Sequence, residues 1–537
     1  MGAGQKFRER SQIPASARLA ADADWDAEAV DLRGVGRPLR RFSWLSPLTL
    51  WRSRNNVLAS LSGDPTENAR AAWVEQQRRL LESEGAPPAA REDFTLERPD
   101  LAAFSFMVLG DTGEGDRSQY SVVPAYLEAS QGSEFAVIAS DVVYPAGDVN
   151  EYVEKFFVPY AHYPRPIYAL PGNHDWLDGL AGFMRHFCRA DPPARKFSPP
   201  PRAKWRRGAM AVHRLFWRRP SALREETLAI GEDLRGEAQA SGPAQPNMYF
   251  CIDTPHLKIV AIDTGILGRL DYQQGQWLRR VSGGRKPKLL ISGKPVYSGE
   301  TFSPRRIMDE SGGDGHAGSI WSIVSDSANN YVGMLSGDIH HYQRHAVALS
   351  DGRKLQCMIT GGGGAFMSST HQIGRVERPE VGEASWTVYP TRADSLRAYS
   401  IAFERKLARI FLWRKGRAAG IPADEAAAIL AERHGLELAD ELERGEGSGD
   451  ASVAVSRRSR RLAALIFPRR QWFSPAKISE ALDWDDPPFF KNFVRVEVAP
   501  GRVVLTAYGV TGLQRDAGDP AIIDRVEIPI GTGDGNE

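Results

Sequence analysis

The chain has 537 residues, more than one ordinary domain of about 100–200 residues, so we expect one large catalytic domain with insertions, or two domains. Its 42% hydrophobic and 25% charged residues are typical of a globular protein, and a net charge of +1 argues against nucleic-acid binding. The three cysteines, Cys188, Cys251 and Cys357, are far apart and predict no disulfide framework, which favours a reducing compartment.

The N-terminus has no apolar segment of the secretory type, and no apolar run approaches the roughly 18 residues of a membrane span. A cytoplasmic location is therefore expected. We interpret residues 1–100 as an N-terminal extension that is partly helical. Its clearest element is a helix over residues 67–84, which ends before a Gly-Ala-Pro-Pro segment.

Short, nearly all-apolar runs recur after residue 100 and predict strands buried on both faces. Helical patterns separate them, at residues 119–129, 150–158 and 271–281. This alternation predicts a layered α/β core, with its ligands in the loops at the carboxyl ends of the strands. The predicted strands are residues 104–109, 135–139, 166–170, 257–262, 287–291 and 330–335.

The predicted core is discontinuous. It spans residues 101–375, with an insertion at 198–247 that begins with Ser-Pro-Pro-Pro. A mostly helical insertion follows over 376–480, and it includes a flexible linker at 445–456. Residues 481–537 carry the alternating run 494–498 and the strand-forming run 503–508, which we interpret as closing strands of the core.

Polar loops follow the predicted strands in a fixed order. The first three begin at Gly110-Asp111-Thr112-Gly113, at Ser140-Asp141 with Tyr144 three residues later, and at Gly172-Asn173-His174-Asp175. The later three contain Ser292-Gly293-Lys294-Pro295, Gly337-Asp338-Ile339-His340 and the glycines 361–364. Each of these loops follows a predicted strand, at the edge of the sheet where that strand ends.

Together these loops resemble those of the calcineurin-like metallophosphoesterases, over roughly residues 104–366, and within that superfamily the branch that includes purple acid phosphatases. The resemblance implies an α/β fold with a β-sandwich core flanked by helices, in αββα layers, carrying helical insertions. It implies an enzyme that hydrolyses phosphate esters, in which a metal-bound hydroxide attacks phosphorus at a two-metal site. The expected cofactors are two divalent or trivalent ions of iron, manganese or zinc.

The resemblance assigns the first metal to Asp111, Asp141, Tyr144 and His340. Many relatives have a histidine two residues after the first aspartate, where this chain has Gly113. In the purple acid phosphatase branch the same loss is compensated by a tyrosine, which Tyr144 matches. A phenolate ligand favours a ferric ion, because both are hard partners. Asp141 would bridge the two metals.

The second metal is assigned Asn173 and Asp338 beside the bridging Asp141. Relatives place a histidine where this chain has Gly293, and another where it has Asp338. Two interpretations remain open: an altered two-metal site, or a weakened second site that fills only with substrate. His316 and His371 are candidates to replace the lost histidine.

The resemblance gives His174 the role of stabilising or protonating the leaving oxygen, and gives Asp175 the role of fixing the tautomer of that imidazole. His341 is expected to line the mouth of the site. Arg344 either binds phosphate or pairs with a carboxylate. The glycine loop 361–364 either presents N–H groups to an anion or forms a tight turn.

Arginine clusters flank aromatic and apolar residues in the segments 37–54, 205–219 and 457–473. Such segments either lie on an anionic membrane or pack their aromatics on the core while the arginines reach solvent. These segments leave a membrane-peripheral scaffold as one alternative to hydrolysis. The changed second-metal positions Gly293 and Asp338 leave a non-hydrolytic metal- or phosphate-binding module as another. The substrate beyond a phosphoester, and the oligomeric state, do not follow from the sequence.

Overall fold

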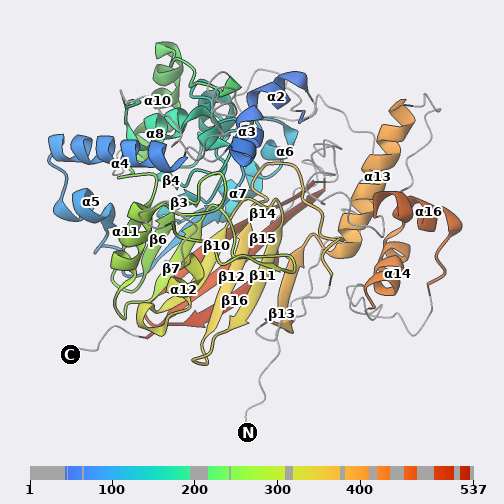
Figure 1. The fold of residues 1–537 in the computed structure, drawn as a ribbon. Coiled ribbons are helices and arrows are strands. Elements are labelled where there is room, and N and C mark those ends of the chain that lie inside the picture. Colours follow the sequence, from blue (N-terminus) through green and yellow to red (C-terminus); the bar gives the residue numbers. More distant parts are fainter. Residues whose placement is uncertain are drawn as a thin grey trace, which may run out of the picture.

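The computed structural model of the chain (Figure 1) describes residues 43–44, 46–62, 66–193, 216–240, 244–308, 318–374, 381–410, 420–435, 453–467, 489–512 and 520–531. His316, residues 445–452 of the predicted linker and residues 205–215 of the second basic segment lie outside these ranges. Within them, no helix has the length and apolar character needed to cross a membrane.

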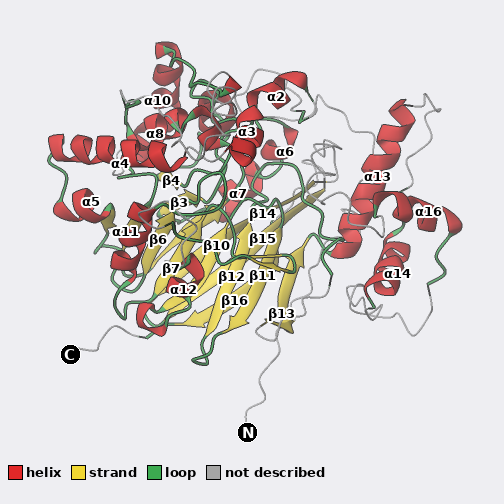
Figure 2. Ribbon diagram, viewed as in Figure 1, coloured by secondary structure: helices red, strands yellow, loops and turns green. Residues whose placement is uncertain are grey.

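Two large sheets form the centre of the molecule (Figure 2). The six-stranded sheet has the order β16-β15-β14-β2-β3-β4, and the eight-stranded sheet has the order β1-β5-β6-β7-β10-β12-β11-β13. The six strands of the first sheet are β2 (Phe104–Leu109), β3 (Phe135–Ile138), β4 (Ile167–Ala169), β14 (Phe489–Ala499), β15 (Arg502–Gly512) and β16 (Ala521–Pro529). The strands of the second are β1 (Thr95–Glu97), β5 (Phe250–Asp253), β6 (Lys258–Ile262), β7 (Lys288–Ser292), β10 (Tyr331–Ser336), β11 (Tyr342–Ala348), β12 (Lys354–Thr360) and β13 (Val381–Tyr389). A small hairpin joins β8 (Tyr297–Ser298) to β9 (Thr301–Phe302).

Most helices gather over one end of the two sheets, and α13, α14 and α16 form a separate group in contact with one another (Figure 2). The helices before residue 190 are α2 (Pro47–Arg52), α3 (Arg54–Ser62), α4 (Thr66–Ser83), α5 (Pro88–Asp93), α6 (Arg117–Tyr120), α7 (Val123–Ala129), the π-helix η3 (Val153–Phe157), the 3-10 helix η4 (Asp175–Asp178) and α8 (Ala181–Cys188). Those that follow are α10 (Glu225–Ala240), α11 (Tyr272–Ser282), α12 (Ile320–Val324), the 3-10 helix η5 (Ser327–Asn329), α13 (Arg392–Ile410), α14 (Ala423–His434) and α16 (Arg457–Ile466).

The sheets share one hydrophobic core, which contains Phe106 and Val494 from the six-stranded sheet and Leu290 and Leu335 from the eight-stranded sheet. All four of these side chains are fully buried, as the apolar runs predicted. The predicted fold class, a mixed α/β fold with a β-sandwich core flanked by helices, is confirmed by the two large sheets and their flanking helices.

Strand direction decides where the loops meet. Strands β2, β3 and β4 run parallel, and so do β6, β7, β10 and β12 in the other sheet. Because parallel strands end at the same edge, the loops after all of these strands lie at one end of the sandwich. The late strand β14 pairs antiparallel with β2, so the chain returns to the core after the helical segment.

Four elements differ from the sequence-based expectation. The expected helix at 119–129 is two helices, because Pro124 lacks an N–H group and stands in the first turn of the new helix α7. The pattern at 150–158 is a π-helix over Val153–Phe157. Strand β1 lies within the expected N-terminal extension and β13 within the expected helical insertion, since each pairs with the edge of the eight-stranded sheet.

Candidate metal centre

Backbone hydrogen bonds tie together the loops that follow strands of both sheets. The N–H of Gly110 donates to the carbonyl of Thr360 at 2.8 Å, and the N–H of Asp111 donates to the carbonyl of Ser140 at 2.9 Å. The N–H of Asp338 donates to Oδ2 of Asp111 at 2.8 Å. The loop after β2 is therefore held from both sheets, and its aspartate lies at their junction.

Three aspartates at this junction have left-handed backbones: φ is 58° at Asp111, 39° at Asp141 and 69° at Asp338. Residues other than glycine adopt positive φ uncommonly, and such strain concentrates at functional sites. Here the conformation turns three carboxylates toward one another directly after β2, β3 and β10. The arrangement stores backbone strain to bring like charges together.

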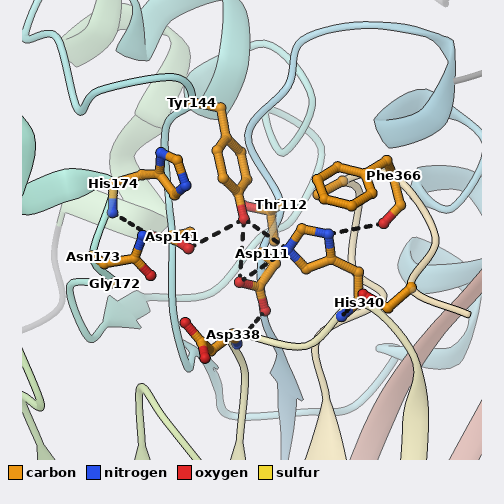
Figure 3. Close-up of polar contacts among 12 residues, drawn as sticks. Asp111, Thr112, Asp141, Tyr144, Gly172, Asn173, His174, Asp338, His340 and Phe366 are labelled. Carbon is orange, nitrogen blue, oxygen red and sulfur yellow. Dashed lines mark hydrogen bonds and ion pairs between the residues drawn. The ribbon is translucent and has the colours of Figure 1, made fainter. Parts of the chain in front are cut away.

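The phenol of Tyr144 is the centre of the first group of side chains (Figure 3). Its hydroxyl donates to Oδ1 of Asp111 and to Oδ2 of Asp141, each at 3.2 Å, and lies 3.2 Å from Nε2 of His340. Nε2 of His340 is 3.7 Å from Oδ1 of Asp111. Donor atoms bound to one ion at about 2.0–2.2 Å lie roughly 3–3.5 Å apart, so these four side chains have spacings close to those around a single ion.

The orientation of His340 suits a metal ligand. Its Nδ1–H donates to the carbonyl of Phe366 at 2.8 Å, so the lone pair is on Nε2, which faces Tyr144 and Asp111 (Figure 3). A backbone carbonyl on the second nitrogen is the usual way to set the tautomer of a metal-binding imidazole. Burial lowers the pKa of His340 to about 3, so the ring is neutral.

The charges of this group call for a cation. Asp111 and Tyr144 are fully buried and Asp141 is 2% exposed. Burial raises the pKa of Asp111 well above its usual range, and Asp141 and Asp338 raise it further. Burial and the same carboxylates raise the pKa of the Tyr144 phenol. Buried like charges are costly unless a positive charge offsets them, so the donor set fits a metal ion.

Histidine, cysteine, aspartate and glutamate side chains alone do not complete this site. Among the residues that the structure describes, no three of these types converge as a metal site. The Tyr144 phenol lies among Asp111, Asp141 and His340, and it is the residue that the resemblance assigned to compensate for the histidine missing at Gly113. A Cβ atom on Gly113 would lie 1.8 Å from the carbonyl oxygen of Val142, so that position has no room for a side chain.

The residues assigned to the second metal converge on a lysine. Nζ of Lys294 donates to Oδ1 of Asn173 at 3.1 Å and makes a very short ion pair with Oδ1 of Asp338. Asp141 turns its Oδ1 to the N–H of His174, at 2.8 Å. A Cβ atom on Gly293 would lie 2.8 Å from Oγ1 of Thr264, so a histidine there would displace that hydroxyl.

His174 lies beside the first group, but the expected partner of its ring is wrong. Its Nδ1–H donates to the carbonyl of Pro145 at 2.8 Å, which sets the tautomer in place of Asp175. The Asp175 carboxylate instead accepts N–H groups from Val142, Val143 and Gly172 at 2.9, 3.2 and 3.0 Å. Asp175 therefore ties the loop after β3 to the loop after β4, and positions the site without touching the imidazole.

Trp44, from the N-terminal segment, was missed in the sequence. Its ring lies edge-on to His174, Tyr144 and Phe366, with centroids 5.2, 5.3 and 5.7 Å away. Its indole N–H donates to Oε1 of Glu114 at 2.9 Å, in the loop after β2. The aromatic-basic composition around residue 44 was the only signal. It left open a membrane-lying segment or one whose aromatics pack on the core, and Trp44, which is 8% exposed, follows the second alternative.

Other predicted residues lie away from this group. Arg344 pairs with Asp524 on β16, with Nη2 to Oδ1 at 3.0 Å, so the carboxylate-pairing alternative holds for it. His341 is 3% exposed and contacts Gln343, so it does not line an open mouth. His371 hydrogen-bonds Ser395 near α13 and is no replacement ligand here.

The glycine loop 361–364 forms a tight connection. Its Gly363 N–H donates to the carbonyl of Gly110 at 2.9 Å, and Nζ of Lys491 donates to the carbonyl of Gly364 at 3.1 Å. The loop thus packs against the first metal-ligand loop, which favours the tight-turn alternative over an anion cradle.

The loop end of the two-sheet sandwich thus gathers buried carboxylates, an imidazole and a phenol. Residues 104–222 match the sequence model of the calcineurin-like phosphoesterases. The predicted resemblance to this superfamily is confirmed over these residues.

No curated protein matches the sequence. Among solved structures, the chain is similar to the purple acid phosphatase PPD1 from yellow lupin (Lupinus luteus) seeds, with a TM-score of 0.34 and 8% identity over 80% of this chain and 54% of that chain. It is also similar to GAP50, the anchor in the inner membrane complex of Plasmodium, with a TM-score of 0.31 and 10% identity over 53% of this chain and 80% of that chain. The similarity to PhoD has a TM-score of 0.32 and 10% identity over 81% of this chain and 73% of that chain. The chain spans only about half of the lupin protein, and similarities this distant say nothing of substrate or partners.

Proposed function

We propose that this protein hydrolyses a phosphate ester with a metal ion held by Asp111, Asp141, Tyr144 and His340. The observation that carries the proposal is the position of the Tyr144 hydroxyl, 3.2 Å from an oxygen or nitrogen of each of the other three side chains. Two carboxylates, a phenol and a neutral imidazole form a hard donor set, which favours iron or manganese.

When bound, the ion supplies a Lewis acid that polarises a phosphoryl oxygen and lowers the pKa of water. The protein supplies the rest. The carbonyl of Phe366 keeps the proton of His340 on Nδ1, and the carbonyl of Pro145 does the same for His174. In the protonated ring, Nε2 of His174 then carries the proton that the leaving oxygen requires, which makes His174 the general acid of the proposal.

The phenol links this proposal to the purple acid phosphatases. Relatives have a histidine at the position of Gly113, where this chain has no space for a side chain. Tyr144 is the residue that compensates for this loss in the purple acid phosphatase pattern. A negatively charged phenolate is stable in this buried, acidic group only when a highly charged cation neutralises it. A ferric ion is therefore the preferred occupant of this position.

Turnover of an aryl phosphate by the metal-loaded protein, together with elemental analysis, tests the proposal. Asp141→Asn should abolish both metal retention and turnover, because it removes a charged donor from the group. Asp253→Asn is the matched control. Asp253 is the last residue of β5, and its carboxylate pairs with Lys286 at 2.7 Å instead of with the site residues. Metal binding without turnover of any phosphoester would instead favour a non-hydrolytic binding module.

A second function is favoured by the surface of α2. Leu48, Leu50 and Trp51 are 65%, 56% and 55% exposed in a segment rich in arginine, and Trp51 lies under the guanidinium of Arg54. Exposed apolar side chains on this short helix suit contact with a lipid surface, and the neighbouring Arg54 would favour an anionic one. Co-sedimentation with anionic vesicles, lost in Leu50→Ser/Trp51→Ser and absent with neutral vesicles, would support this function.

A further inference from the structure

The side chain of Lys294 enters the site from the loop after β7. Its ammonium contacts Oδ1 of Asn173 and Oδ1 of Asp338, both oxygens of the kind that binds a hard metal ion. Asp338 in turn donates its N–H to Asp111, a member of the first group. Asp338 therefore lies between the Lys294 ammonium and the first metal position. The ammonium neutralises the carboxylate of Asp338, the third carboxylate of the site.

The surrounding structure holds Lys294 in this place. Its N–H donates to Oγ1 of Thr264 at 3.1 Å, and its carbonyl accepts the hydroxyl of Ser292 at 3.1 Å. A Cβ atom on Gly268 would lie 2.9 Å from Cδ of Lys294, so this glycine leaves room for the aliphatic part of the side chain. With 14% of its side chain exposed, Lys294 is packed rather than free in solvent.

We infer that the ammonium of Lys294 occupies the second cation position, so that this protein binds one metal ion where its superfamily would hold two. The inference rests on the proposed function, which places the first ion at Tyr144. An ion between Asn173 and Asp338 would have to displace Lys294. Because residue 293 is a glycine, that position supplies no imidazole ligand to favour the exchange. The ammonium supplies a single positive charge that is covalently attached, in place of the larger charge of a second ion.

A lysine in this position changes what the site does to a phosphate group. An ammonium donates up to three hydrogen bonds, two of which go to Asn173 and Asp338. The third is available to a phosphoryl oxygen of the substrate. Lys294 is thus placed to bind the substrate and to offset charge that develops in the transition state.

The ion count of the full-length protein tests this assignment. We expect one Mn²⁺ per chain by elemental analysis after loading at millimolar Mn²⁺ and desalting, with the electron paramagnetic resonance spectrum of an isolated ion. Lys294→Ala should bind a second Mn²⁺ and show the altered spectrum of two coupled ions. The control is Lys288→Ala on β7, the strand that precedes the Lys294 loop, because the Lys288 ammonium donates to the carbonyls of Gly284, Lys286 and Asn329.

The outcomes separate the two proposals. Two ions in the unmodified protein would overturn the role of Lys294 and leave the proposed phosphoesterase site intact. An unmodified protein that retains no ion after loading with either Mn²⁺ or ferric iron would defeat the proposed function itself. A Lys294→Ala protein that still takes a single ion at millimolar Mn²⁺ would also overturn the assignment, because the ion count would then not depend on the lysine.

Discussion

The indole of Trp44 lies edge-on to the imidazole of His174, with the two ring centroids 5.2 Å apart. Trp44 comes from the N-terminal segment and His174 from the loop after β4, 130 positions later in the printed sequence. Trp44 is 8% exposed and is fixed by the hydrogen bond from its indole to Glu114. The N-terminal segment therefore forms a wall of the proposed site, and the proposed general acid His174 lies between Trp44 and Pro145.

We expect Trp44→Ala to lower kcat by about tenfold, because a small displacement of a catalytic group has a large effect on rate. Steady-state kinetics with an aryl phosphate would measure it. Trp51→Ala is the matched control, since Trp51 is 55% exposed on α2 and should leave kcat unchanged. Equal kinetics for Trp44→Ala and the unmodified protein would show that the indole does not position His174.

His174→Ala should lower kcat by about 10²–10⁴-fold, the usual contribution of a general acid or base, while the metal content stays the same. Esters with good leaving groups should lose less, because their departing oxygen needs little protonation. A series of aryl phosphates of graded leaving-group pKa would measure this. An equal loss across the series would indicate that His174 binds the phosphate, and a loss of metal would make it a ligand.

Tyr144→Phe should remove the visible charge-transfer band expected of the iron-loaded protein, because that band requires a phenolate bound to ferric iron. Absorption spectroscopy of the two iron-loaded proteins would measure it. Tyr126→Phe controls for the loss of a buried hydroxyl, since Tyr126 packs on Tyr160 and Phe493 and not on the site residues. A band that survives in Tyr144→Phe would separate this protein from the purple acid phosphatases.

Asp175→Ala should lower the free energy of unfolding by about 2–4 kcal/mol, since three buried N–H groups lose their acceptor. Thermal unfolding would measure the change as a lower Tm. Because Asp175 does not touch the His174 ring, the ratio of rates for good and poor leaving groups should match that of the unmodified protein. A ratio that shifts as in His174→Ala would mean that Asp175 acts through the imidazole after all.

Much of the fold and of the first metal group follows from local patterns. The apolar run 104–109 coincides with β2, and the runs before Asp141 and Asp338 end in β3 and β10. Burial on both faces requires an uninterrupted apolar sequence, so such strands are visible without a partner. The resemblance assigned Asp111, Asp141, Tyr144 and His340 to one metal. The loops that carry them share one edge of the sheets, and the structure brings these four side chains within contact distance.

Only the tertiary structure decided the contacts between segments that are distant along the chain. Lys294 was an ordinary lysine in the sequence until the loops after β4, β7 and β10 met around its ammonium. Trp44 became a wall of the site and Asp175 a backbone acceptor for the same reason. The local sequence determines the order of strands and polar residues. The direction of each side chain depends instead on which neighbours fill the space around it.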